Sequence, residues 1–392
     1  MIWRKRLDFS KINGKIIKII SEEKSMQENT FPKERLFSLD LLRGLDMILL
    51  VVIGPLIGAS NKIWHFSEPF MNQFKHFYTG FTLWDIIMPL FIFMCGAAIP
   101  LALKKRIKDG KAGSDYWKHV FSRVVMLWIL GMIVQGNLLS LDRMKINFFT
   151  NTLQSIAIGY LITALSLLVS SKAVRISIPI VLALVYTVIL ASLGDYSEFG
   201  NAAFKVDFAV QSFLLPDKHS SLLNPNHYTW YLTSLMFGAM TLTGYHSTEI
   251  LLAAKPKAKK AINLSVLGIS LLAIGFISAI WIPVIKPIYT LSFTSQAMGW
   301  CVLALAFLYY LTDVKMFRKG LYLPILFGQC ALTAYIVGGF FRPVLQRLSQ
   351  MLAQGLPHVL SFDTAEQNLA VAVITVVELT IVLIIRRRLR TR

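Results

Sequence analysis

Residues 84–103 read WDIIMPLFIFMCGAAIPLAL, a run in which Asp85 is the one charged residue. A helix needs about 20 mainly apolar residues to cross a membrane, so this run is long enough to span one. The whole chain of 392 residues has the same character, because 55% of its residues belong to the set AVILMFWYC and 16% are charged. Soluble domains average about 45–50% apolar and about 25% charged residues, and disordered segments are less apolar still. The composition therefore excludes both classes and predicts a polytopic membrane protein.

Outward from this run, the chain contains further stretches of similar length and apolarity. They predict an all-α fold, a polytopic integral membrane helix bundle with about ten transmembrane helices. The sixth stretch is short and rich in threonine, so it carries the weakest signal. The ten stretches are 41–59, 84–103, 120–139, 152–169, 176–193, 230–244, 262–282, 293–311, 321–341 and 369–385.

Basic residues set the expected orientation of these helices. The chain has 40 Lys and Arg against 21 Asp and Glu, a formal charge of +19. In a soluble protein this excess would suggest nucleic acid, but in a membrane protein it marks cytoplasmic loops. The basic residues gather at both termini and in every second loop, so we expect both termini to be cytoplasmic and no nucleic-acid partner. The expected organisation is a basic amphipathic segment at 1–38, a transmembrane domain at 39–386 and a basic tail at 387–392.

The three cysteines do not suggest a disulfide or a metal site. Cys95, Cys301 and Cys330 all lie inside apolar runs. Their spacing matches no disulfide framework and no zinc motif, so we expect neither.

Polar residues near the outer ends of the predicted helices suggest a shared cavity. The alternating topology places Asp85, Asn137 and Gln154 in the outer half of the membrane, and Lys286 at the outer end of the eighth span. Ionisable groups at membrane depth are costly and usually face a cavity or a partner. We therefore expect one outer polar cavity beside His76. The pattern Thr82-x-x-Asp85 also allows a second interpretation, in which Asp85 only caps the second helix.

The segment 194–228 is the longest one expected between the helices, and it lies on the outer side. A loop of that length in a compact bundle is usually functional or a lid, although it also fits a structural cap. It contains Asn201 and Asp207, together with His219 and His227, which compete with His65 and His76 as candidate outer histidines.

At the cytoplasmic start of the first span, RLFSLDLLRG occupies residues 35–44 and places Asp40 and Arg43 one helical turn apart. One interpretation is a capping and snorkelling pair. The other is that Arg43, with the neighbouring basic loops, binds a donor that carries phosphate.

These residues resemble a known family, the transmembrane acyltransferases of the heparan-α-glucosaminide N-acetyltransferase type, especially their bacterial branch. The resemblance rests on R-L-x-S-L-D-x-x-R-G at 35–44 and on G-F-T-x-x-D at 80–85, followed by P-x-F-x-F-x-x-G at 89–96. It continues with L-Q-x-I-A-x-x-Y at 153–160 and G-x-x-A-L-x-x-Y at 328–335, and with Asn201 and Asp207 in the outer loop.

The chain departs from the family pattern at a few places. The family's histidine falls on Lys75, with His76 one residue later, and an asparagine of the lysosomal enzymes falls on Gly54. An expected arginine is Ser155, and an expected asparagine is Cys330. Because an imidazole is largely neutral near pH 7 and a solvated ammonium is not, proton acceptance favours His76 over Lys75.

The resemblance implies an acyltransferase that uses cytoplasmic acetyl-CoA or a related acyl-CoA to acylate an amino sugar or glycan on the outer face. It implies a bacterial cytoplasmic membrane and no metal. The phosphates of the donor would bind at the basic inner face, where the candidates are Asp40, Arg43, Lys104, Lys105 and Arg106. His76 and Asp85 are the candidate catalytic residues, and Gln154, Asn201, Asp207 and Lys286 are the candidate substrate-binding residues.

Two other functions stay open at this point. The same outer cavity would suit a carrier or flippase for a small glycan or a lipid-linked precursor, and the departures would suit a family member without activity. The sequence does not choose between a histidine that removes a proton and one that carries the acyl group. It does not identify the acceptor, and a homo-oligomer is a further possibility.

Overall fold

The computed structural model describes residues 36–103, 106–108, 111–142, 146–214, 228–360 and 362–391, and is all-helical apart from one short hairpin. The antiparallel strands β1 (Ile107–Lys108) and β2 (Lys111–Ala112) form that hairpin. The first half of the chain contains α2 (Phe37–Ile48), η1 (Leu49–Ile53), α3 (Gly54–Trp64), α4 (Glu68–Asn72), η2 (Leu83–Ile86), α5 (Ile87–Ala102), α6 (Ser114–Val134), η4 (Leu138–Ser140), α7 (Thr152–Ser166) and α8 (Lys172–Leu193). The second half contains α9 (Ala202–Leu214), α10 (Ser234–Leu252), α11 (Lys257–Ser278), α12 (Leu291–Tyr309), η5 (Tyr310–Val314), α13 (Tyr322–Gln329), α14 (Ala331–Tyr335), η6 (Ile336–Phe340), α15 (Arg342–Ala353), α16 (Leu356–Leu360) and α17 (Thr364–Thr391).

Each of the ten apolar stretches overlaps a helix, and the chain is an integral membrane protein. Among the described residues, seven helices are long and apolar enough to cross a membrane, or eight when the bent pair Tyr322–Gln329 and Ala331–Phe340 counts as one span. The shorter helix α7 has 15 residues, and α10, with its threonines, is not among the seven. The count of ten and the cytoplasmic position of both termini therefore stay predictions, as does the division at residues 38 and 386.

Burial separates central helices from peripheral ones. The apolar window of Leu83–Ala102 is 72% buried and that of Leu291–Val314 is 61% buried, whereas the window of Lys172–Leu193 is 11% buried. A helix that is apolar all round is stable either in a protein core or against lipid. The central α5 and α12 are therefore core helices, and the outward face of α8 is available to lipid.

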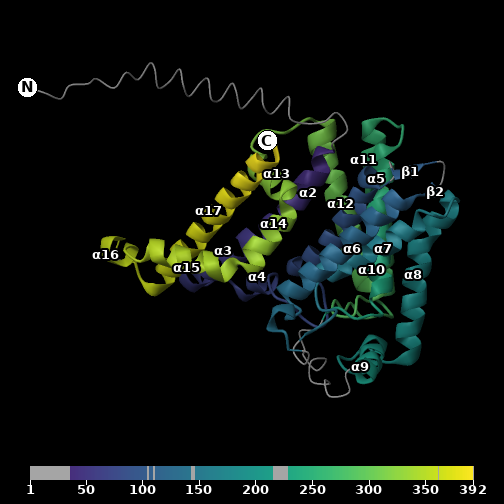
Figure 1. The fold of residues 1–392 in the computed structure, drawn as a ribbon, viewed down its shortest axis with the longest axis horizontal. Coiled ribbons are helices and arrows are strands. Elements are labelled where there is room, and N and C mark those ends of the chain that lie inside the picture. The colour runs from purple at the N-terminus through teal and green to yellow at the C-terminus, as the bar shows by residue number, and fades with distance from the viewer. Residues whose placement is uncertain are drawn as a thin grey trace, which may run out of the picture. The chain divides into compact units, whose positions relative to one another are not determined.

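A second group of helices packs around its own apolar cluster. In Figure 1, α2, α13, α14 and α17 lie together on one side of the bundle. Their contact is a cluster of buried side chains that includes Met47 of α2, Phe327 of α13 and Leu379 of α17. This packing places η1 and η6 beside each other, because Val51 of η1 meets Gly338 of η6.

Both of these segments, η1 and η6, are π-helical turns. Pro55 lies just after η1 and has no N–H, so the normal helical hydrogen bond cannot form at that point. The second turn, η6, comes after α14, and the helix axis bends by 86° between α13 and the α14–η6 segment, at Cys330. Such turns inside helices occur frequently at functional sites.

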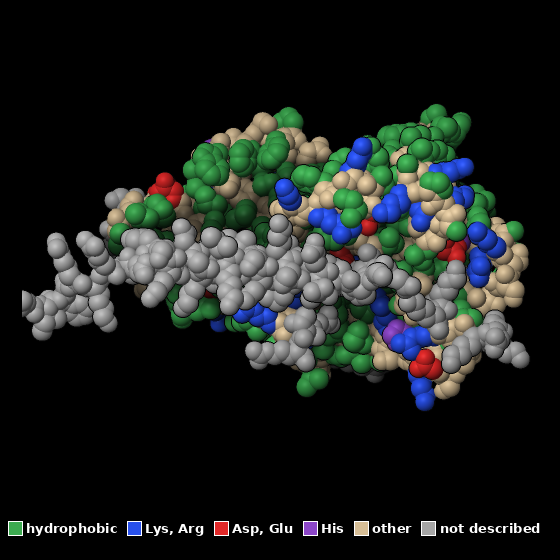
Figure 2. Space-filling view, turned by 90° about the horizontal axis from the view of Figure 1, so that it is seen from above, with side chains coloured by type: hydrophobic (Ala, Val, Ile, Leu, Met, Phe, Trp, Pro, Cys, Tyr) green, Lys and Arg blue, Asp and Glu red, His purple; other side chains and the backbone are tan. Residues whose placement is uncertain are grey.

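The end of the bundle where α11 begins and α17 ends is shown in Figure 2. Blue Lys and Arg side chains are spread over this face, with few red acidic ones between them. This is the end that the sequence analysis assigns to the cytoplasm.

Helices α5 and α10 cross with their backbones in contact, because glycine residues at the crossing carry no Cβ atom. A Cβ atom on Gly244 would collide with the carbonyl oxygen of Phe93, and one on Gly96 would collide with that of Thr241. We expect Gly244→Ala to destabilise the protein by about 3 kcal/mol, at the upper end for overpacking, because a backbone carbonyl cannot rotate away. The thermal midpoint in detergent measures this. Gly58→Ala in α3 is the control, because nothing lies within 4 Å of a Cβ there. Equal midpoints for the two variants would contradict the close crossing.

Candidate functional site

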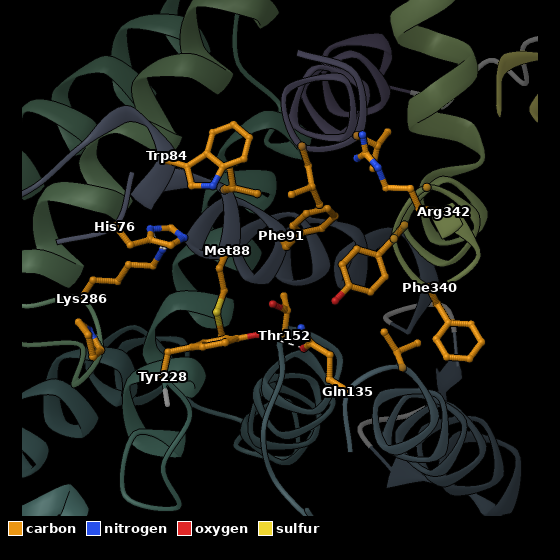
Figure 3. A pocket seen from close by; sticks show the side chains of 18 of the residues that line it. His76, Trp84, Met88, Phe91, Gln135, Thr152, Tyr228, Lys286, Phe340 and Arg342 are labelled. Atoms are coloured by element: carbon orange, nitrogen blue, oxygen red, sulfur yellow. Dashed lines mark hydrogen bonds between the residues drawn. The ribbon is translucent and has the colours of Figure 1, made fainter. Parts of the chain in front are cut away.

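A cavity of about 800 Å³ opens between the two groups of helices. Its walls are mainly aromatic and aliphatic, with a few polar groups, as is usual for sites that bind small molecules. Figure 3 shows His76, Trp84 and Lys286 at one end and Arg342 and Phe340 at the other, with Phe91 and Thr152 between them. The lining residues are Leu50, Val51, His76, Phe77, Tyr78, Trp84, Ile87, Met88, Phe91, Val134, Gln135, Thr152, Glu198, Tyr228, Lys286, Pro287, Tyr335, Gly338, Gly339, Phe340 and Arg342.

Three of the candidate residues meet at one end of this cavity. His76 Nδ1 lies 2.8 Å from Asp85 Oδ1, and Lys286 Nζ lies 3.1 Å from the same oxygen. Lys286 Nζ is also 3.0 Å from His76 Nδ1 and 3.4 Å from Nε2. The Asp85 side chain is 1% exposed, whereas that of His76 is 54% exposed. The carboxylate is therefore enclosed, while the imidazole reaches the cavity.

Asp85 is fixed by the turn that starts the second span. Thr82 N and Thr82 Oγ1 both donate to Asp85 Oδ2, at 2.9 Å and 2.8 Å, and the two residues form a capping box at η2. The cap uses Oδ2, whereas His76 and Lys286 use Oδ1. The two interpretations of Asp85, helix cap and partner of His76, therefore hold together.

Lys286 comes from a loop that follows α11, more than two hundred residues away in the chain. Gly80 N donates to Val284 O at 2.8 Å, and Thr79 pairs with Ile285 as an antiparallel bridge. These backbone contacts hold the loop of Lys286 against the loop of His76. Burial lowers the pKa of Lys286, and the charge and hydrogen bond of Asp85 oppose this shift.

The cluster suits proton transfer at the imidazole. When Asp85 Oδ1 accepts the Nδ1 proton, the tautomer is fixed and Nε2 keeps its lone pair. One carboxylate compensates one ammonium, so the cluster is electrically neutral when the imidazole is neutral. A group positioned in this way can accept a proton from a substrate held in the cavity.

Lys75, which occupies the family register, lies outside the cavity wall. Its Nζ donates to Asn72 Oδ1 at 3.1 Å in an exposed position. The other described outer histidine, His65, is exposed and ends α3 in a left-handed conformation with φ 46°. His219 and His227 lie outside the described residues.

Three predicted substrate-binding residues do not line the cavity. Gln154 is buried, accepts from Thr150 N at 2.8 Å and donates to Phe148 O. Asn201 caps α9, because its Oδ1 accepts from Phe204 N at 2.8 Å and its Nδ2 donates to Ser197 O. Asp207 is buried in α9 and accepts from Tyr231 N at 2.8 Å. Each side chain binds nearby backbone, so all three hold loops in place.

The buried Asp207 carries a pH-dependent prediction. Burial raises its pKa to about 8 from 3.8. Because folding favours the protonated form, this contribution to stability is complete below about pH 3.8 and falls as the pH rises through about 8. We expect Asp207→Asn, which stays neutral, to flatten the decline of the thermal midpoint across that range. Parallel pH profiles for the wild type and the variant would contradict this.

The predicted phosphate-binding residues lie away from this cavity. Arg43 Nη1 is 3.6 Å from Asp40 Oδ1, and Arg106 Nη1 is 2.7 Å from Asp115 Oδ2. Lys104 and Lys105 lie outside the described residues. A further basic residue outside the cavity lining is Arg123 of α6, whose guanidinium lies 4.7 Å over the Tyr160 ring. The sequence analysis missed Arg123, because a lone arginine inside an apolar run gives no motif.

The residues that depart from the family pattern each fit their surroundings in this structure. A Cβ on Gly54 would collide with the Trp84 ring, so the ring of a cavity residue fills the space that an asparagine there would need. Ser155 is buried and donates to Asn151 O at 3.1 Å. Cys330 is buried at the bend after α13, with its Sγ 3.9 Å from Leu383 O.

Sequence reasoning also missed most of the cavity wall. Tyr228 OH donates to Gln135 Oε1 at 3.1 Å, which joins the start of the α10 segment to the end of α6. Tyr335 had a signal, the G-x-x-A-L-x-x-Y match, and Arg342 was visible only as one of the few basic residues of the outer loops. Among the described residues, no three His, Cys, Asp or Glu side chains gather at a distance that could hold a metal ion.

Comparisons with known proteins found one family model and one relative that match part of this chain. Residues 35–141 match a family model described as a domain of unknown function, DUF5009. A segment of 145 residues is 26% identical to the human protein named heparan-alpha-glucosaminide N-acetyltransferase, and covers 36% of this chain and 20% of that protein. The chain therefore matches about one fifth of the length of this relative. The family match includes Arg43, His76 and Asp85, and the two matches together indicate a distant relationship to an N-acetyltransferase.

Proposed function

We propose that this protein is a membrane acyltransferase that transfers an acyl group from acyl-CoA to an amino sugar or glycan. The observation that carries the proposal is the contact of His76, Asp85 and Lys286 at the end of a cavity large enough for a sugar. The distant N-acetyltransferase relative supports the same class of reaction. The location proposed is a bacterial cytoplasmic membrane, with the donor on the inner side and the acceptor on the outer side.

In the proposed reaction, the amine or hydroxyl of the acceptor attacks the thioester carbonyl. The C–S bond breaks, an amide or ester bond forms, and His76 Nε2 accepts the proton that the acceptor loses. That proton then passes to the CoA thiolate. Lys286 Nζ lies beside the imidazole and can stabilise negative charge on the carbonyl oxygen. The same geometry would also let the imidazole carry the acyl group briefly.

Acyl transfer can be measured directly on the purified protein. The experiment adds radiolabelled acetyl-CoA and, in separate samples, glucosamine or glucosamine 1-phosphate to the protein in lipid nanodiscs. We expect label in at least one of the two sugars and release of free CoA. Binding of acetyl-CoA without labelled product would indicate an inactive protein. In sealed vesicles, uptake of sugar without release of CoA would indicate a carrier. Either of these results would overturn the proposal.

The donor assignment gives a separate prediction at the inner face. Arg43 lies one turn after Asp40 at the start of α2, and a charge-assisted hydrogen bond to phosphate contributes about 1.5–3 kcal/mol. We expect Arg43→Ala to weaken acetyl-CoA binding by about ten-fold or more, as measured by calorimetry. Arg318→Ala is a control at a cytoplasmic loop outside the motif. Unchanged affinity in a folded Arg43→Ala protein would leave Arg43 with a structural role.

A further inference from the structure

Arg342 lines the cavity at the end opposite His76. It is the first residue of α15, and Phe341 separates it from the π-helical turn η6. Figure 3 shows the two side chains at opposite ends of the same cavity, with Phe91 between them. The position also adds the partial positive charge of a helix N-terminus to the charge of the guanidinium.

This arginine lacks a partner within the part of the chain that the structure describes. No hydrogen bond or ion pair of its side chain occurs there, whereas Arg43 pairs with Asp40 and Arg106 with Asp115. Burial lowers the pKa of Arg342, and no carboxylate offsets this effect. A half-buried guanidinium without a counter-charge is costly, so the end of the cavity favours an anion.

The rest of the cavity has the form of a site for a ligand with two different ends. Glu198 also lines the wall, and it is close enough to Tyr78, two residues after His76, to interact with it electrostatically, so that end can receive an amine. Between the ends the wall is aromatic, and the rings of Phe91 and Tyr335 lie 6.0 Å apart in an edge-to-face contact. Aromatic walls with a few placed polar groups bind and orient small ligands.

We propose that the acceptor carries an anionic group, such as a carboxylate, sulfate or phosphate, and that Arg342 binds this group while the reacting amine or hydroxyl lies at His76. This inference rests on the proposed function and narrows its acceptor class to acidic sugars. Arg342 is then a determinant of acceptor binding with no part in proton transfer.

Equilibrium binding without acyl-CoA tests the inference apart from turnover. Calorimetry would compare glucosamine 1-phosphate with glucosamine on the wild-type protein in detergent, with inorganic phosphate as a third probe. We expect the wild type to bind the sugar phosphate about ten-fold to a hundred-fold more tightly than glucosamine, because a charge-assisted hydrogen bond has that effect. Arg342→Gln should remove this preference, and Arg342→Lys should keep part of it. Arg347→Gln is the matched control, because Arg347 is an exposed arginine of the same helix outside the cavity.

The outcomes separate this inference from the proposed function. Equal affinity of the wild type for both sugars, no binding of glucosamine 1-phosphate at millimolar concentration, or a preference that survives Arg342→Gln would overturn the inference. Inorganic phosphate that binds as tightly as the sugar phosphate would also overturn it, by showing an anion site without acceptor recognition. A preference that depends on Arg342, with no acyl transfer, would support the anion site and reject the acyltransferase. Acyl transfer to glucosamine, with equal affinity for glucosamine and glucosamine 1-phosphate, would support the acyltransferase and reject the anion site.

Discussion

His76→Ala is expected to lower the rate of acyl transfer by at least about 10²–10⁴-fold, the range that a positioned general base contributes. The imidazole contacts Asp85 at 2.8 Å and is the most exposed side chain of the cluster, at 54% against 9% for Lys286. If the imidazole carries the acyl group, the same change abolishes turnover completely. The measurement is single-turnover transfer from radiolabelled acetyl-CoA, with acetyl-CoA affinity measured in parallel and expected to be unchanged.

Lys75→Ala is the matched control for this prediction. Lys75 is the neighbouring residue and the one in the family register, but its ammonium donates to Asn72 in an exposed position. Its removal therefore leaves the cluster intact, and we expect wild-type rates. Full turnover by His76→Ala would show that the assignment is wrong, and His227 in the outer loop would be the next residue to test. A large loss with Lys75→Ala would place the lysine in the reaction instead.

The second large effect is expected from Asp85→Asn, which removes the carboxylate beside Lys286. The two side chains are 1% and 9% exposed, and their charged atoms are 3.1 Å apart. Removing one partner of a buried ion pair leaves the other charge uncompensated and costs about 3–5 kcal/mol. We expect a loss of stability in this range, measured from thermal or denaturant unfolding in detergent, and a loss of acyl transfer as well.

A double-mutant cycle separates the ion pair from the catalytic role. Lys286→Met alone leaves a buried carboxylate, whereas Asp85→Asn with Lys286→Met leaves no buried charge. The double variant should recover most of the lost stability and remain inactive, because the imidazole still lacks its carboxylate partner. Additive losses of stability would show that Asp85 and Lys286 do not interact as the geometry indicates. Recovery of acyl transfer in the double variant would remove Asp85 from the mechanism.

The sequence by itself determined the features that depend on short stretches of chain. Apolar length predicted the helices, since a run such as 84–103 has to satisfy its backbone internally to be stable in lipid. The pattern Thr82-x-x-Asp85 predicted the capping box, because the residues of a cap are within one turn of each other. The orientation of the bundle and the count of ten spans rest on the same kind of local signal, and they stay predictions.

Only the tertiary structure decided which polar residues share a site. Asp85 and Gln154 look alike in the sequence, as polar residues at the outer ends of apolar runs, yet Gln154 binds the backbone at Phe148 and Thr150. Lys286 reaches Asp85 because Gly80 N bonds to Val284 O across two loops. Arg342 lines the cavity at the start of α15, after a helical segment whose axis bends by 86° at Cys330. Contacts of this kind depend on how closely the helices pack, as where Gly96 of α5 lies against the backbone of Thr241 in α10. Packing between residues far apart in the chain leaves no periodic pattern in the sequence, so the sequence could not predict these contacts.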